Sequence, residues 1–236
     1  MVALGMTFVR RSMERGHAAL GWLDSRHSFS FGDYHDPAWM GFRSLRVINE
    51  DHVAAGGGFP PHPHRDMEIF TYVVSGALEH GDNLGNRRVL RPGDIQVMGA
   101  GRGIVHSEFN PSATEPAHFL QVWLRPSATG LPPQYAEWHM PAGRGNDPKL
   151  LIIAGDGRDG AASLRQDADV YRLRCDASCA VDHELRPGRA LWLQVVRGGL
   201  GVDGVALGPG DAWATDGAGR HRLELGSGTE ALLFDL

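Results

Sequence analysis

Residues 58–64 of the chain read Gly-Phe-Pro-Pro-His-Pro-His, and residues 103–110 read Gly-Ile-Val-His-Ser-Glu-Phe-Asn. Each stretch holds two polar side chains that are separated by one residue. Successive side chains of a β-strand point to opposite faces, so residues two apart share a face. Two such pairs on neighbouring strands of a barrel would aim four ligand groups at one interior point. These four residues are His62, His64, His106 and Glu108.

The mixture of ligand types predicts the kind of metal. Imidazole nitrogens with one carboxylate suit a divalent first-row transition metal, whereas calcium and magnesium prefer oxygen ligands throughout. One His-x-His pair alone is weak evidence. Two pairs within one barrel are strong evidence, because four polar groups on inward faces are costly to bury without a ligand. The sequence therefore predicts a metal-binding β-barrel.

The overall composition argues against several classes of partner. The chain has 236 residues and a formal net charge of -5, which leaves no basic footprint for nucleic acid or an anionic membrane. No apolar run approaches the roughly 20 residues of a transmembrane helix. Residues 1–9 are apolar, but Arg10 and Arg11 follow them, and a secretory signal has the reverse order. We therefore expect a cytoplasmic protein.

The two cysteines of the chain are Cys175 and Cys179. We expect reduced, partly buried thiols, as is usual in the cytoplasm. A zinc site would need two further ligands close by, and only His183 lies near in the sequence. A metal at the cysteines is therefore the less favoured interpretation.

An internal repeat relates the two halves of the chain. Three blocks recur in the same order at a nearly constant offset, which indicates two copies of one structural unit. Short apolar runs between Gly, Pro, Asn and Asp predict strands, with hairpin loops at 82–86 and 202–204. The matching blocks are 72–78 with 194–200, 90–94 with 207–211, and 99–102 with 217–220.

We therefore predict an all-β fold of two jelly-roll barrels in tandem. The N-terminal barrel, residues 1–130, would carry the metal site, and residues 131–236 would form the second barrel. The Pro/Gly-rich segment 125–149 is expected to connect the two. The nearest candidate for a helix, at residues 8–21, is weak.

The second copy is expected to lack metal ligands and to have a structural role. Transfer of the four ligand positions through the nearest matching blocks finds no imidazole at any of them. The residues reached in this way are Glu184, Arg186, Glu224 and Gly226.

The same residues resemble the two motifs of the cupin superfamily. Gly56, the two histidines of 58–64 and Glu68 fit the first motif, although Gly76 arrives one residue late. His106 and Asn110 fit the end of the second motif. The resemblance is closer to one branch, the pirin family of bicupins, and is specific over 59–110, with further pirin-like stretches at 29–34 and 40–42.

The resemblance to pirins implies two cupin barrels with a single iron in the first. The ion would be Fe(II), although a purified sample could carry Ni, Cu, Zn or Mn instead. Bacterial pirins are associated with quercetin 2,3-dioxygenase activity, and animal pirins with transcriptional co-regulation through the redox state of the metal. The implied ligands are His62, His64, His106 and Glu108.

The first functional hypothesis is a dioxygenase that cleaves flavonols such as quercetin. The metal would bind the substrate oxygens and dioxygen, and Glu108 would act as the base that deprotonates the substrate hydroxyl. By resemblance, the ring opens with incorporation of both oxygen atoms and loss of carbon monoxide. Glu68 is expected to orient a ligand histidine. Trp123, Phe70 and Met98 have the size to line an aromatic pocket, although core packing explains them equally well.

Two other hypotheses remain open at this stage. In one, the iron is a redox sensor and the protein regulates a protein partner without catalysing a reaction. In the other, the metal serves to stabilise the barrel, and no open coordination position exists. The first predicts a binding surface at the metal, and the second predicts a closed site.

Overall fold

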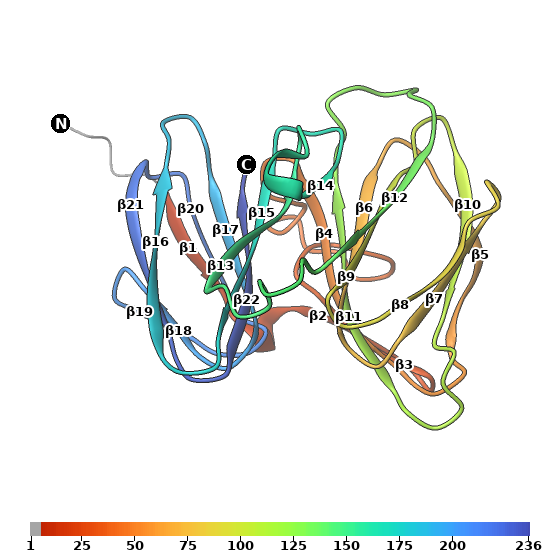
Figure 1. Ribbon diagram of the computed structural model, residues 1–236, viewed down its shortest axis with the longest axis horizontal. Helices are drawn as coiled ribbons and strands as arrows, with labels where there is room; N and C mark the ends of the chain where they lie inside the picture. Colours follow the sequence, from red (N-terminus) through yellow and green to blue (C-terminus); the bar gives the residue numbers. More distant parts are fainter. Residues whose placement is uncertain (1–5) are drawn as a thin grey trace. The chain divides into compact units, whose positions relative to one another are not determined.

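The computed structural model describes residues 6–236, so the start of the apolar segment 1–9 lies outside the described residues. The described chain consists of β-strands and two 3₁₀ turns, η1 (Ser12–Glu14) and η2 (Arg158–Gly160) (Figure 1). The all-β prediction is confirmed. No helix of these residues is long and apolar enough to cross a membrane.

The first barrel comprises residues 16–140 and 162–166, the latter including β14 (Ala162–Ser163). One sheet has the order β12-β9-β6-β11-β4-β3-β2, and the other has the order β5-β10-β7-β8. The strands are β2 (Gly16–Leu20), β3 (Leu23–His27), β4 (Leu45–Val53), β5 (Gly58–His64), β6 (Glu68–Ser75), β7 (Leu78–Asp82), β8 (Arg87–Leu90), β9 (Asp94–Gly99), β10 (Ile104–Phe109), β11 (Ala117–Leu124) and β12 (Gln134–His139).

The second barrel comprises residues 6–15, 141–161 and 167–236. Its sheets have the orders β1-β20-β17-β22-β15-β13 and β16-β21-β18-β19. The strands are β1 (Thr7–Arg10), β13 (Lys149–Ala154), β15 (Asp169–Cys175), β16 (Cys179–Leu185), β17 (Leu191–Arg197), β18 (Leu200–Val202), β19 (Val205–Leu207), β20 (Ala212–Thr215), β21 (Gly219–Leu225) and β22 (Thr229–Asp235).

The barrel boundaries differ from the predicted division at residue 130. β1 pairs along its whole length with β20 of the second barrel, from Thr7 opposite Thr215 to Arg10 opposite Ala212. At the other end, β12 pairs with β9 and buries Trp138 in the first barrel. Part of the predicted connection 125–149 is therefore a strand, β12. Its partner β9 is distant in sequence, so the local composition could not predict the pairing.

The weak helix candidate at residues 8–21 is wrong. The segment forms β1, the turn η1 and β2, because both strands find partners in sheets. Gly16 shows how closely this segment packs: a Cβ atom there would lie 2.3 Å from the ring of Tyr34. The predicted hairpin loops are confirmed, since 82–86 joins β7 to β8 and 202–204 joins β18 to β19.

Strand register gives a residue-by-residue match between the barrels. Leu78 opposite Leu90 in the first corresponds to Leu200 opposite Leu207 in the second. The match extends through the neighbouring strands, from β7 to β10 and β5, and from β18 to β21 and β16. The resulting pairs are His62 with His183, His64 with Leu185, His106 with His221, and Glu108 with Leu223.

The predicted absence of imidazole from the second copy is therefore wrong, because the loops between matching blocks differ in length and shift the alignment. Both imidazoles have other partners. His183 Nε2 lies 2.9 Å from an Asp235 carboxylate oxygen. The nitrogens of His221 each lie 2.9 Å from an oxygen, one of Asp203 and one of Gly217. Among residues 6–236, the clusters able to hold a metal ion lie in the first barrel.

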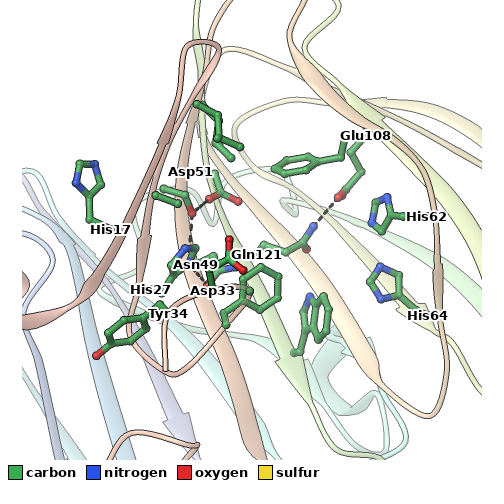
Figure 2. Close-up of a pocket in the computed structure, with 18 residues that line it drawn as sticks. His17, His27, Asp33, Tyr34, Asn49, Asp51, His62, His64, Glu108 and Gln121 are labelled. Carbon is green, nitrogen blue, oxygen red and sulfur yellow. Dashed lines mark hydrogen bonds between the residues drawn. The ribbon is translucent and has the colours of Figure 1, made fainter. Parts of the chain in front are cut away.

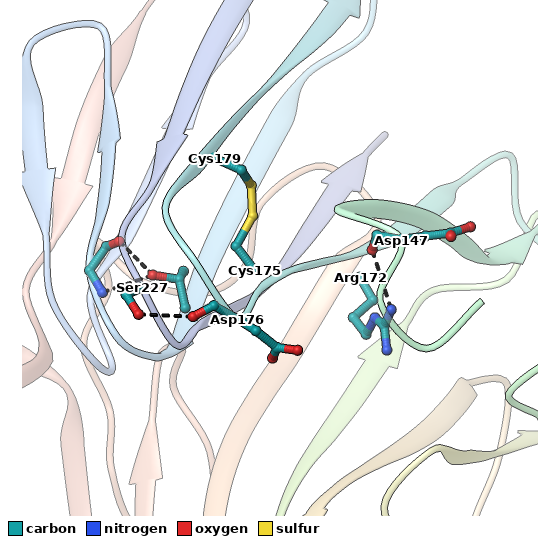
Figure 3. The surroundings of a disulfide bond; sticks show 8 residues. Asp147, Arg172, Cys175, Asp176, Cys179 and Ser227 are labelled. Atoms are coloured by element: carbon teal, nitrogen blue, oxygen red, sulfur yellow. Dashed lines mark hydrogen bonds between the residues drawn. A yellow bond between two sulfur atoms is a disulfide. The ribbon is translucent and has the colours of Figure 1, made fainter. Parts of the chain in front are cut away.

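The prediction of reduced thiols is also wrong, because Cys175 and Cys179 form a disulfide. It links the end of β15 to the start of β16 across a tight turn, where the Cα atoms are 6.3 Å apart (Figure 3). The Ser227 hydroxyl donates to the Asp176 carbonyl in the same turn. The spacing of the two cysteines does not by itself predict the bond, since it depends on the hairpin that brings the thiols together.

Replacing both cysteines by alanine should lower the free energy of unfolding by about 2 kcal/mol, the loop-entropy value for so short a loop. Denaturant unfolding of the variant and the oxidised parent measures the difference. Thiol titration of the unfolded parent should find no free thiol. One or two reactive thiols per chain in freshly purified protein would contradict the bond.

Candidate metal centre

Three histidines converge at the pairing of β5 with β10. His62 lies directly opposite His106, and His64 lies opposite Ile104, one step further along the same face. The three imidazole ring centroids are 4.4–4.8 Å apart. One ligand atom of each lies within 4.8 Å of those of the other two. Nitrogens about 2.0–2.1 Å from a shared ion require this kind of convergence.

Glu108 approaches the same place from a different angle. A bulge between His106 and Glu108 shifts the register, so that Glu108 lies opposite Phe59. One oxygen of its carboxylate lies within 4.8 Å of a ring nitrogen of His106 and of His80. Glu108 also lines a cavity together with His62 and His64. The structure thus brings all four predicted residues into one region of the barrel.

Two neutral side chains hold the buried Glu108 carboxylate. The Gln121 amide donates to Oε2 at 2.7 Å, and the Thr71 hydroxyl lies 3.3 Å from Oε1. The same hydroxyl lies 2.9 Å from the Gln121 amide oxygen, which fixes the amide. No cation is among these partners, so a bound metal ion would supply the positive charge that a buried carboxylate lacks.

Hydrogen bonds set the tautomer of His62. Its Nδ1 lies 2.8 Å from the Pro60 carbonyl oxygen. A carbonyl oxygen only accepts, so Nδ1 carries the proton and Nε2 keeps its lone pair. The lone pair is the group that a metal ion binds.

A buried chain of side chains positions the ring of His106. The Asp82 carboxylate lies 3.1 Å from His80 Nε2, which therefore carries the proton. His80 Nδ1 is left to accept, and it lies 3.0 Å from the Gln96 amide nitrogen and 3.3 Å from His106 Nδ1. The His106 ring is thus held on its Nδ1 side, which leaves Nε2 as the nitrogen available to a metal.

The residues fit a divalent metal ion. His106 Nε2 is buried and has no hydrogen-bond partner among the described residues. Leaving such an atom unsatisfied costs roughly 1–3 kcal/mol, which a metal bond at that atom would offset. Burial and neighbouring imidazoles lower the pKa of His64 and of His106 to about 3. Both rings are neutral at pH 7, as metal ligation requires.

A cavity of about 530 Å³ opens beside the cluster (Figure 2). This volume lies in the range of roughly 300–1,000 Å³ that is typical of small-molecule sites. Of the side chains considered for an aromatic pocket, Trp123 lines the cavity, whereas Phe70 and Met98 are packed in the core.

Comparison with known proteins agrees with this geometry. Residues 8–124 match the family model described as Pirin, and residues 151–236 match that of the quercetinase C-terminal cupin domain. A relative from Escherichia coli K12 named quercetin 2,3-dioxygenase is 43% identical over 231 residues, which are 98% of this chain and 99% of the relative. The chain belongs to the pirin family.

Solved structures of pirins share the fold. A crystal structure of YhhW from Escherichia coli is 44% identical, with a TM-score of 0.93 over 98% of this chain and 97% of that chain. The bacterial pirin YhhW in complex with nickel(II) is 42% identical, with the same TM-score over 98% and 99%. The resemblance inferred from 59–110 is confirmed, and the bicupin fold with it.

The position of Glu68 differs from the sequence-based expectation. Its buried carboxylate accepts a hydrogen bond from the backbone N–H of Arg165 at 3.0 Å and makes no hydrogen bond to a histidine. The chain turns at Asp66, whose φ is 50°, and enters the other sheet. The alternation that begins at His64 therefore does not continue to Glu68, which instead holds the segment 162–166.

His80 and Asp82 have no role in the sequence-based prediction, although His80 belongs to the pirin-like pattern. His80 lies opposite Glu108 on the adjacent strand. The sequence does not show that β7 is the second neighbour of β10, so this proximity could not be predicted from it. Asp82 ends β7 at the predicted hairpin loop, and its carboxylate also accepts from the Leu84 and Asn86 backbone.

Replacing His80 by valine, the type of residue at the matching position 202, should weaken metal binding about 10- to 100-fold, because His106 loses the group that orients it. Competition with a chromophoric chelator measures the affinity. The matched control is His139→Gln, which removes an exposed histidine of the same barrel. Equal affinity in both variants, with intact folds, would exclude the orienting role.

The metal-free protein should lose stability as the pH falls from 7 to 4. The unfolded chain binds protons at His64 and His106 below pH about 6.5, whereas the folded chain does so only near 3. Asp51, with its pKa raised to about 7, contributes to the pH dependence of stability with the opposite sign, because the folded chain binds its proton more readily than the unfolded chain does. Denaturant unfolding across this range should show a flatter profile for His64→Gln, in which Asp51 is unchanged. Identical profiles would contradict the prediction.

Proposed function

We propose that this protein is a metal-dependent dioxygenase that cleaves flavonols such as quercetin. One observation carries the proposal: the histidine cluster forms one end of a cavity with room for a small molecule. Relatives named quercetin 2,3-dioxygenase support the same activity. The proposed co-substrates are a polyphenol and dioxygen.

The proposed metal is Fe(II), and its proposed ligands are His62, His64, His106 and Glu108. Three neutral imidazoles with a carboxylate suit this ion, and they also suit Ni, Cu, Zn or Mn in a purified sample. The nickel(II) complex of the Escherichia coli pirin supports a site that accepts more than one divalent metal. When bound, the metal supplies Lewis-acid and redox chemistry to the substrate and dioxygen.

Glu108 is the proposed base. Gln121 anchors its Oε2, so the carboxylate keeps a fixed position at the cavity wall. Its Oε1 has lone pairs beyond the long contact with Thr71 and can take the proton of a substrate hydroxyl. Loss of that proton makes the flavonol 3-oxygen a stronger ligand and the ring a better reductant.

Aromatic side chains beside the ligands provide a surface for a flat substrate. The Trp123 ring lies edge-to-face with His64, at 4.7 Å between centroids, and with Phe31 at 5.4 Å. Phe59 and Leu23 also line the cavity. These walls exclude water from the reacting groups and bury the apolar faces of the rings.

The cavity also bears on the competing hypotheses. A redox sensor for a protein partner calls for a binding surface at the metal, and a purely structural metal calls for a closed site. A concave pocket with apolar walls and a few polar groups suits a small molecule instead. The enzyme hypothesis is therefore the one we favour.

Protein loaded anaerobically with Fe(II) should bleach the flavonol absorption band and consume oxygen when air is admitted. His62→Ala should abolish the activity through loss of the metal. Glu108→Gln should lower kcat by roughly 10²- to 10⁴-fold, as expected for loss of a general base, and metal analysis of the same sample corrects for altered occupancy.

His139→Gln serves as the control, because this histidine is exposed and is not among the residues that line the cavity. Oxygen uptake with a set of flavonols is the readout. Full Fe(II) occupancy without turnover of any of them would refute the proposed function.

A further inference from the structure

A second polar cluster lies on the wall of the cavity across from the metal ligands. It consists of Ser25 and His27 from β3 and Asn49 and Asp51 from β4, all of them buried. Figure 2 shows His27, Asn49 and Asp51 on one side of the cavity, and His62, His64 and Glu108 on the other. We refer to the four residues as the β3–β4 cluster.

Hydrogen bonds fix the geometry of the β3–β4 cluster. The Ser25 hydroxyl donates to Asp51 Oδ1. His27 Nδ1 lies 2.8 Å from Asn49 Oδ1 and 3.4 Å from the Ser25 hydroxyl. An amide oxygen only accepts, so His27 carries its proton on Nδ1. The cluster is therefore held in place before any ligand enters.

Asp51 is an unusual residue for a cavity wall. Its side chain is 3% exposed, and no cation pairs with it among the described residues. Its Oδ1 accepts from Ser25, while Oδ2 accepts no hydrogen bond from those residues. Burial and the carboxylates of Glu108 and Glu50 raise its pKa to about 7, against the lowering effect of Ser25. A buried carboxyl without a cation is costly unless a partner uses it.

The space between the two polar ends is lined mainly by apolar side chains. Phe31 and Trp123 meet edge-to-face, and Leu23 and Phe59 continue the wall. A cavity with polar groups at both ends and apolar sides matches a flat aromatic molecule that carries oxygens at both ends. Flavonols with hydroxyls on their outer rings have this pattern.

We infer that Asp51, oriented by Ser25, is a specificity-determining residue that binds a ring hydroxyl at the end of the substrate remote from the metal. The inference rests on the proposed flavonol substrate. Asp51 Oδ2 accepts the hydrogen bond of a phenolic hydroxyl, while Oδ1 stays bonded to Ser25. Flavonols without hydroxyls beyond the metal-binding 3-position gain nothing from Asp51.

Anaerobic binding to the Fe(II)-loaded full chain tests the inference without requiring turnover. The probes are quercetin and 3-hydroxyflavone, which shares the metal-binding oxygens but has no other hydroxyl. Asp51→Asn should raise the Kd of quercetin about tenfold or more, as expected for loss of a hydrogen bond to a buried carboxyl group. The Kd of 3-hydroxyflavone should change less than twofold.

Two further variants complete the experiment. His139→Gln removes an exposed histidine of the same barrel that is not among the cavity-lining residues, so it should leave both Kd values unchanged. Ser25→Ala should selectively weaken the binding of quercetin, by less than Asp51→Asn does. This variant keeps the test valid if Asp51→Asn does not fold.

If Asp51→Asn weakens the binding of both probes equally, or does not weaken the binding of quercetin, the inference is overturned. So would a metal-loaded parent that binds neither probe. Selective binding that depends on Asp51 but yields no oxygen uptake would refute the proposed dioxygenase activity and support the role of Asp51. The two proposals can thus fail separately.

Discussion

The antiparallel pairing of β5 with β10 is the constraint on which the site depends. It places His62 directly opposite His106, where side chains in such pairs approach each other within roughly 4.5–5.5 Å at Cβ. His64 then follows on the same face. A slip of one residue would turn one strand's ligands away from the other's. The site therefore depends on register as much as on residue type.

The second barrel shows what the same register does with other residues. His183 and His221 keep the directly opposed positions, but Leu185 and Leu223 replace the other two ligands and join a core that contains Trp213. The two imidazoles are bonded to oxygens of their own barrel. One scaffold thus lines a cavity with imidazoles and a carboxylate in the first barrel, and packs leucines into an apolar core at two of the matching positions in the second.

The polar groups of the first barrel form a connected arrangement. Asp82 and His80 position the His106 ring, and Gln121 holds Glu108 at the cavity wall. The β3–β4 cluster supplies the opposite wall from strands that precede the histidines in sequence. Buried polar groups need partners, so His106 and Glu108 depend on residues that are not proposed metal ligands.

The all-β class, the hairpin loops and the residues two apart that share a face can be predicted from the sequence, because these follow from local periodicity and turn chemistry. Which strands are neighbours becomes known only from the folded chain. Because of these pairings, Asp51 lies across the cavity from Glu108, and β1 belongs to the second barrel. In the same way, Glu68 accepts from Arg165, and Cys175 bonds to Cys179. Strand pairing is non-local: alternation fixes the face on which a side chain lies, but pairing between distant segments fixes what it meets.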